Sequence, residues 1–71
     1  MEKLTTEIAT QRVATIKEVS GDDEVAHGKE DSLRDWFIKC LALGLYDIDE
    51  ARAVAEIVQS TNDIHFFRWC A

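Results

Sequence analysis

Hydrophobic and polar positions follow one clear helical period between residues 22 and 45. Apolar residues recur there at the spacing of one face of an α-helix. The members of this stripe are Ala26, Leu33, Phe37, Cys40, Leu41 and Gly44, and Trp36 lies at its flank. We therefore expect one long amphipathic helix that runs to Leu43, with the other segments packed against it.

The flanking segments predict two further helices. Residues 6–19 have apolar residues at approximately helical spacing, although their β-branched residues lower the helix propensity, and the residues before them are expected to be frayed. Asp47 and Glu50 have the spacing of a capping box, which predicts the start of the third helix. Its inward face is expected to comprise Ile48, Ala51, Val54, Ala55 and Val58, and residues 60–62 should end it. The connection after the long helix is short, so the third helix should return antiparallel to it.

Capping residues and glycines are expected to set the ends of these helices. Ser20, with Asp23 three residues later, resembles an N-cap followed by an acidic first turn. Gly44 fits the left-handed position that ends a helix. Gly28 either weakens the long helix or lets another backbone approach it closely.

The closing segment 63–71 is rich in aromatic residues. Asp63 is expected to cap a short helical turn. We expect Ile64, Trp69 and one of Phe66 and Phe67 to dock on the helices, because a disordered end would not carry so much apolar surface. The other Phe should be exposed, and the candidate interface residues are Trp36, Phe66, Phe67 and Trp69.

Length and charge restrict the class of protein. A chain of 71 residues forms one domain at most, with a small core that self-association or a partner would help to stabilise. The net charge is −6, and residues 18–56 hold eleven acidic but only four basic side chains. This balance disfavours direct nucleic-acid binding, which needs clustered Lys and Arg. It leaves open a solvated acidic face, a basic protein partner, or mimicry of nucleic acid.

The chain shows no sign of a secreted or membrane protein. Met1 is followed directly by polar residues rather than an apolar leader, and no apolar run is long enough to span a bilayer. Two cysteines, Cys40 and Cys70, do not indicate a disulfide framework, and Cys40 on the apolar stripe is expected to act as a small hydrophobe. We therefore expect a reducing, cytoplasmic setting.

One polar cluster interrupts the apolar stripe of the long helix. Glu30 projects within the stripe, where a carboxylate is costly unless it is paired. Its possible partners are Arg34 and His27 on the same helix and Arg12 on the first. Asp31 lies just beyond, toward solvent.

Three interpretations of this cluster compete. In the first, Glu30 is a paired, partly buried carboxylate that fixes the helix register, with His27 and Arg34 as local partners. In the second, His27 binds a metal together with Glu30 or Asp31, with His65 or a symmetry mate completing the ligand set. In the third, His27 and a carboxylate form a general acid–base pair, although no nucleophile or oxyanion motif accompanies them.

Two short motifs resemble a pattern found in small proteins encoded by phages and prophages. The first is the A-H-x-x-E-D stretch formed by Ala26, His27, Glu30 and Asp31. The second is the terminal F-x-R-W-x-A, formed by Phe66, Arg68, Trp69 and Ala71. Such proteins are mostly of unknown function, so the resemblance implies an accessory role in phage–host interplay rather than an activity. It also implies that the two motifs meet, with Arg68 as the partner of Glu30 or Asp31.

These observations predict an all-α fold in which residues 1–71 form one small domain of three helices, with a long central helix and a docked C-terminal aromatic turn. The expected structural polar cluster is His27, Glu30, Asp31, Arg34 and Arg68. The expected function is that of a non-enzymatic, phage- or prophage-borne protein without a cofactor. It would act in the host cytoplasm through protein–protein contacts, with a host protein as one possible partner, and form a homo-oligomer. The alternatives are an acidic inhibitor that mimics nucleic acid, and a metal-binding protein that uses His27, Glu30 and Asp31.

Overall fold

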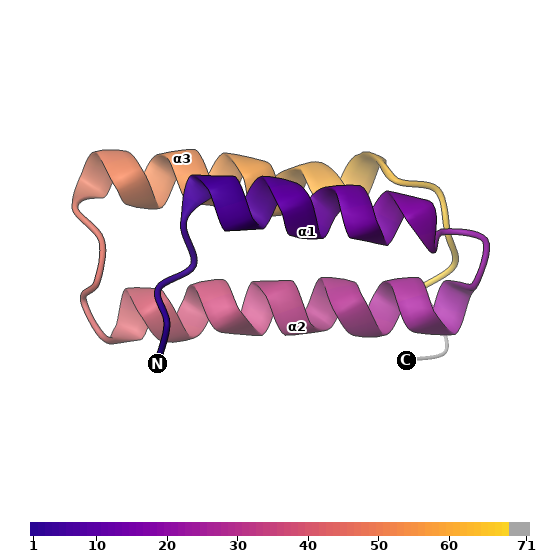
Figure 1. Cartoon of the computed structure of the whole chain (residues 1–71), viewed down its shortest axis with the longest axis horizontal. Coiled ribbons are helices and arrows are strands. Elements are labelled where there is room, and N and C mark those ends of the chain that lie inside the picture. The colour runs from indigo at the N-terminus through magenta and orange to yellow at the C-terminus, as the bar shows by residue number, and fades with distance from the viewer. Residues whose placement is uncertain (69–71) are drawn as a thin grey trace.

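Three helices and one short 3₁₀ turn make up the part of the chain that the computed structural model describes, residues 1–68. They are α1 (Thr6–Glu18), α2 (Asp23–Ala42), α3 (Ile48–Gln59) and η1 (Ser60–Asp63). α1 and α3 lie side by side above α2, and the chain reverses direction at each end of α2 (Figure 1). The prediction of a small all-α domain with a long central helix is confirmed. No helix within residues 1–68 has the length and apolar character needed to cross a membrane.

Each helix begins at a side chain that accepts a backbone N–H three residues further on. These N-caps are Thr5, Asp22 and Asp47, at 3.2, 3.2 and 2.8 Å from the donor nitrogens. The cap satisfies one of the amide groups that the first turn of a helix leaves without a partner. The prediction of Ser20 as the cap of α2 is wrong, because its hydroxyl donates instead to the carbonyl of Lys17 at the end of α1.

Gly44 ends α2, as predicted. It has a φ of 68°, in the left-handed region. Its N–H donates to the carbonyl of Leu41, and the next N–H, from Leu45, donates to that of Cys40. This pair of bonds is a Schellman motif, which satisfies carbonyls that the end of a helix leaves open.

The core lies where the three helices and the segment after η1 meet. Its buried apolar residues are Leu4, Ala9, Val13, Ile16, Ala26, Leu33, Cys40, Val54, Val58 and Ile64. Cys40 is a free, fully buried thiol that packs as a small hydrophobe. Cys70, its possible disulfide partner, lies outside the described residues.

Residues 2–4 are anchored to α2, to α3 and to the connection between them rather than frayed. Leu4 is fully buried, its N–H donates to the sulfur of Cys40 at 3.4 Å, and its carbonyl accepts the Tyr46 hydroxyl at 2.6 Å. Burial, with smaller contributions from Cys40 and Glu50, raises the pKa of Tyr46, so the phenol keeps the proton that it donates. Lys3 also pairs with Glu50 at 2.6 Å. Sequence periodicity missed this anchoring because the partners are distant along the chain.

Other predictions need correction at the helix ends. Leu41 and Ile48 were expected on buried faces, but 44% and 72% of their surfaces are exposed. Both lie near the reversal between α2 and α3 (Figure 1). Asp63 is the last residue of η1 and therefore does not cap a following turn. No backbone approaches Gly28 closely, since a Cβ built there meets nothing within 4 Å.

Candidate functional site

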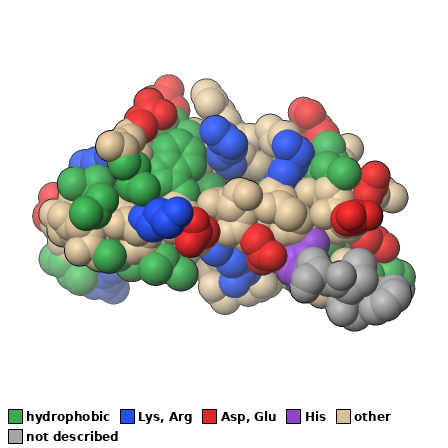
Figure 2. Space-filling model, turned by 90° about the horizontal axis from the view of Figure 1, so that it is seen from below, with side chains coloured by type: hydrophobic (Ala, Val, Ile, Leu, Met, Phe, Trp, Pro, Cys, Tyr) green, Lys and Arg blue, Asp and Glu red, His purple; other side chains and the backbone are tan. Residues whose placement is uncertain are grey.

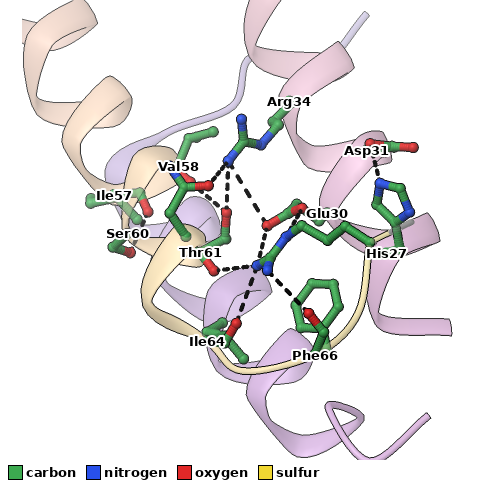
Figure 3. Close-up of polar contacts among 12 residues, drawn as sticks. His27, Glu30, Asp31, Arg34, Ile57, Val58, Ser60, Thr61, Ile64 and Phe66 are labelled. Carbon is green, nitrogen blue, oxygen red and sulfur yellow. Dashed lines mark hydrogen bonds and ion pairs between the residues drawn. The ribbon is translucent and has the colours of Figure 1, made fainter. Parts of the chain in front are cut away.

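Glu30 is the one buried carboxylate of α2, and it lies where the apolar stripe predicted it. Only 3% of its surface is exposed. Arg68 reaches it from the other end of the described chain. Its Nε donates to Oε1 at 2.8 Å and its Nη2 donates to Oε2 at 3.0 Å (Figure 3). This bidentate geometry is the strong form of an arginine–carboxylate pair.

The same guanidinium also organises the segment that follows η1. Nη2 donates to the carbonyls of Thr61 and Ile64, at 2.8 and 3.2 Å, and Nη1 donates to that of Phe66 at 3.3 Å. The centre of the guanidinium lies 3.8 Å from the centroid of the Phe66 ring. Residues 61–68 therefore curve around the side chain of Arg68, and Glu30 holds that side chain on α2.

Arg34 forms a second connection between α2 and η1. Its Nη2 donates to Oδ1 of Asn62 at 2.8 Å and to the hydroxyl of Thr61 at 3.2 Å, and it lies 3.9 Å from Oε2 of Glu30 (Figure 3). Thr61 is fully buried, and its hydroxyl donates to the carbonyl of Val58 at 3.0 Å. These contacts satisfy the polar groups that the turn buries, as a buried turn requires.

The electrostatic balance keeps Glu30 ionised. Burial is the largest single influence on its pKa and raises it. Hydrogen bonding, from Arg68 first and Thr61 second, and the positive charges of Arg68 and Arg34 together outweigh burial, so the pKa of Glu30 lies below its ordinary value of 4.5. The same partnership raises the pKa of Arg68. Glu30 and Arg68 therefore remain a charged pair near neutral pH.

His27 and Asp31 form a separate contact. His27 Nε2 lies 3.4 Å from Oδ1 of Asp31, and the imidazole is mostly buried while Asp31 is exposed. Nδ1 of His27 is buried and has no hydrogen-bond partner within residues 1–68. Both oxygens of Glu30 are bound by Arg68, so the three candidate metal ligands do not converge on one point. Across the described residues, no three His, Cys, Asp or Glu side chains are grouped to hold an ion.

The four aromatic interface candidates divide into three cases. Trp36 is half-buried, and its Nε1 donates to the carbonyl of Glu2 at 2.7 Å. Phe66 is half-buried beneath the guanidinium, whereas 66% of the surface of Phe67 is exposed, so the prediction that one Phe docks is confirmed. Trp69 lies outside the described residues.

Arg12 does not reach Glu30, which corrects one expected partner. Its guanidinium lies 5.3 Å from the centroid of the Trp36 ring instead. Sequence spacing could not distinguish the two positions, because a long side chain on α1 can lean toward either side of α2.

An exposed apolar patch surrounds the reversal between α2 and α3. Its members, which we call the apolar patch, are Ile38, Leu41, Leu43, Leu45 and Ile48, with between 37% and 72% of each surface exposed. Figure 2 shows hydrophobic side chains gathered at this end of the molecule, where α2 ends. The interface candidates named from the sequence do not include these residues, although Leu41, Leu43 and Leu45 are closely spaced in the sequence.

On the face of the molecule that Figure 2 shows, the acidic side chains do not form one continuous surface. Figure 2 shows them interspersed with Lys and Arg over the exposed side of α2. Lys39 pairs with Asp35 at 2.8 Å, and Lys3 pairs with Glu50. A mimic of nucleic acid would need an uninterrupted row of negative charge, so these pairs weigh against that alternative.

The polar cluster fastens the C-terminal segment to α2. Its opposite charges meet one another, and its guanidinium donors are directed at the carboxylate and at backbone carbonyls. These contacts agree with the structural interpretation of Glu30, with Arg68 in place of His27 as its main partner. The geometry is the basis for interpreting this chain, because no protein-family model, curated protein or solved structure matches it.

Proposed function

We propose that this chain is a small non-enzymatic protein that acts through protein–protein contacts and associates with a second copy of itself through the apolar patch. The observation that supports the proposal is the clustering of five large aliphatic side chains, Ile38, Leu41, Leu43, Leu45 and Ile48, on exposed surface. Single exposed hydrophobic residues are ordinary, but several large ones at one end of a small domain favour an interaction surface there.

The small core favours a second copy as the occupant of this surface. A domain of 71 residues buries a limited fraction of its apolar surface, and covering the patch in a dimer would bury more. The patch also includes the reversal between α2 and α3, where backbone hydrogen bonds from Gly44 and Leu45 close the end of α2. A preorganised apolar surface loses little conformational entropy when it is covered.

The biological setting follows from the resemblance of the A-H-x-x-E-D and F-x-R-W-x-A motifs to small phage and prophage proteins. On this basis we propose a phage- or prophage-borne accessory protein that works in the host cytoplasm. A host protein is then the partner of the dimer.

Light scattering of the purified full chain tests self-association. We expect a solution mass above the 8.1 kDa of one chain, and a return to 8.1 kDa in the double variant Ile38→Lys/Leu43→Lys. Both positions are more than half exposed, so the variant should still fold. The matched control is Val25→Lys, an exposed apolar position of α2 outside the patch, which should keep the wild-type mass.

Three outcomes would count against this proposal. The first is a wild-type chain that is monomeric at high concentration, and the second is a double variant that still associates. The third is a mass that rises only when a divalent metal is added, which would favour the metal hypothesis for His27 and Asp31 instead.

A further inference from the structure

A groove lies between α1 and α2, away from both the polar cluster and the apolar patch. Its volume is about 580 Å³, and small-molecule sites typically span about 300–1,000 Å³. The buried side chains of Ile16 and Leu33 line it, together with the more exposed Val25 and Trp36. The groove therefore offers a mainly apolar bed between two helices.

Gly28 keeps the middle of this groove open. It is a lining residue within α2, and a Cβ built on it meets nothing within 4 Å. Any larger side chain at this position would therefore occupy the groove. A glycine inside a helix lowers helix stability relative to alanine, so the open space is present at a cost to α2.

The charge of the groove is opposite to that of the chain. Arg12 and Lys29 line it against a single carboxylate, Glu24, whereas the whole chain has a net charge of −6. The guanidinium of Arg12 lies 5.3 Å from the Trp36 ring centroid, and that ring is oriented by its bond to the Glu2 carbonyl. A cation is thus positioned beside an aromatic wall at one end of an apolar groove.

We propose that this groove binds a small amphiphile with one carboxylate and an apolar body. The carboxylate pairs with Arg12, whose planar guanidinium matches it in a bidentate geometry. The apolar body lies past Gly28 against Leu33 and Val25. The site shares no residue with the apolar patch, so it stands whether or not the chain associates with a second copy.

Titration of the full-length, isotope-labelled chain with decanoate, below the concentration at which it forms micelles, tests the site by NMR. The chain has three glycines, which makes their amide signals easy to assign. We expect saturable shifts of the Gly28 amide and the Trp36 indole signals. The Gly44 amide, at the far end of α2, is the internal control and should not move. Absence of a saturable shift, or an equal shift at Gly44, would overturn the proposal.

Two variants then distinguish the contribution of the apolar lining of the groove from that of the Arg12 charge. Gly28→Leu should abolish decanoate binding, as followed at the Trp36 indole, because its side chain fills the groove. Arg12→Gln should weaken binding by at least about fivefold, the loss expected for one charge-assisted contact. Arg52→Gln is the matched control, since it removes the same charge from exposed surface of α3 and should leave binding unchanged.

The remaining controls keep the test decisive. Circular dichroism establishes that Gly28→Leu is helical, and Gly28→Ala, a smaller change, should weaken binding if the larger variant fails to fold. Decanol, which lacks the carboxylate, should bind the wild-type chain more weakly than decanoate does. Decanol should also bind the wild-type chain and Arg12→Gln with equal affinity. Wild-type affinity in Gly28→Leu, or equal losses in Arg12→Gln and Arg52→Gln, would show that decanoate binds elsewhere.

Discussion

Replacing Arg68 with Ala should destabilise the domain by removing the partner of a buried carboxylate. The change deletes two hydrogen bonds to Glu30 and three to backbone carbonyls of the segment 61–66. Breaking a buried ion pair from one side costs about 3–5 kcal/mol, because the remaining charge is left without compensation. Two features reduce this value here.

The first feature is the exposure of Arg68, whose side chain is about one-third exposed, at 32%, so solvent screens part of the interaction. The second is Arg34, which already lies 3.9 Å from Glu30 and can take over part of the charge. We therefore expect a loss of roughly 2–3 kcal/mol. In a domain of this size, 1 kcal/mol corresponds to about 4–8 °C in Tm, so Tm should fall by at least ~8 °C.

Thermal unfolding followed by circular dichroism measures this loss, and a double-mutant cycle assigns it. Arg68→Ala, Glu30→Ala and the double variant should not be additive, with a coupling energy of about 1–3 kcal/mol between the two sites. The control is Arg52→Ala, an exposed arginine of α3 without a described ion pair, which should change stability by less than ~0.5 kcal/mol. A Tm unchanged in Arg68→Ala, or strict additivity in the cycle, would refute the reasoning.

The remaining predictions concern acid stability, two glycines and one hydroxyl. Because folding lowers the pKa of Glu30, its ionised form stabilises the fold fully above pH 4.5, and this stabilisation is lost as pH falls through the lower folded-state pKa. In acid denaturation, the stabilities of wild type and Glu30→Gln should therefore converge. Gly28→Ala should raise the free energy of unfolding by about 0.5–1 kcal/mol, whereas Gly44→Ala should lower it by about 1–2 kcal/mol because of its positive φ, as urea titrations would show. Tyr46→Phe should cost about 0.5–1.5 kcal/mol and increase amide exchange near Leu4, whose carbonyl loses its donor; an unchanged exchange rate would contradict this.

Local chemistry in the sequence was sufficient to locate the helices. The apolar period between residues 22 and 45 corresponds to α2, and Asp47 caps α3 as its spacing predicted. Gly44 occupies the left-handed position that ends α2. These features depend on contacts between residues a few positions apart, so their spacing carries the information directly. Ser20 failed as a cap because Asp22, two residues later, competes for the same role.

The sequence also located the unusual carboxylate, although not its partner. The position of Glu30 within the apolar stripe implied that it would be buried and paired. Local spacing favoured His27 and Arg34 as partners of Glu30, and the resemblance implied that Arg68 pairs with either Glu30 or Asp31. Only the path of the chain after η1 brings the guanidinium of Arg68 to both oxygens of Glu30.

The tertiary structure decided what is covered and what remains open. Leu4 is buried because it packs against Cys40 and Tyr46, which are far along the chain, whereas Leu41, next to Cys40, stays 44% exposed. The groove beside Gly28 likewise depends on the separation of α1 from α2. The sequence by itself determined the helices, the cap of α3 and the need to pair Glu30, since these follow from periodicity, local spacing and the cost of an unpaired charge. The identity of distant neighbours came only from packing, because burial is a property of how whole helices are placed against one another.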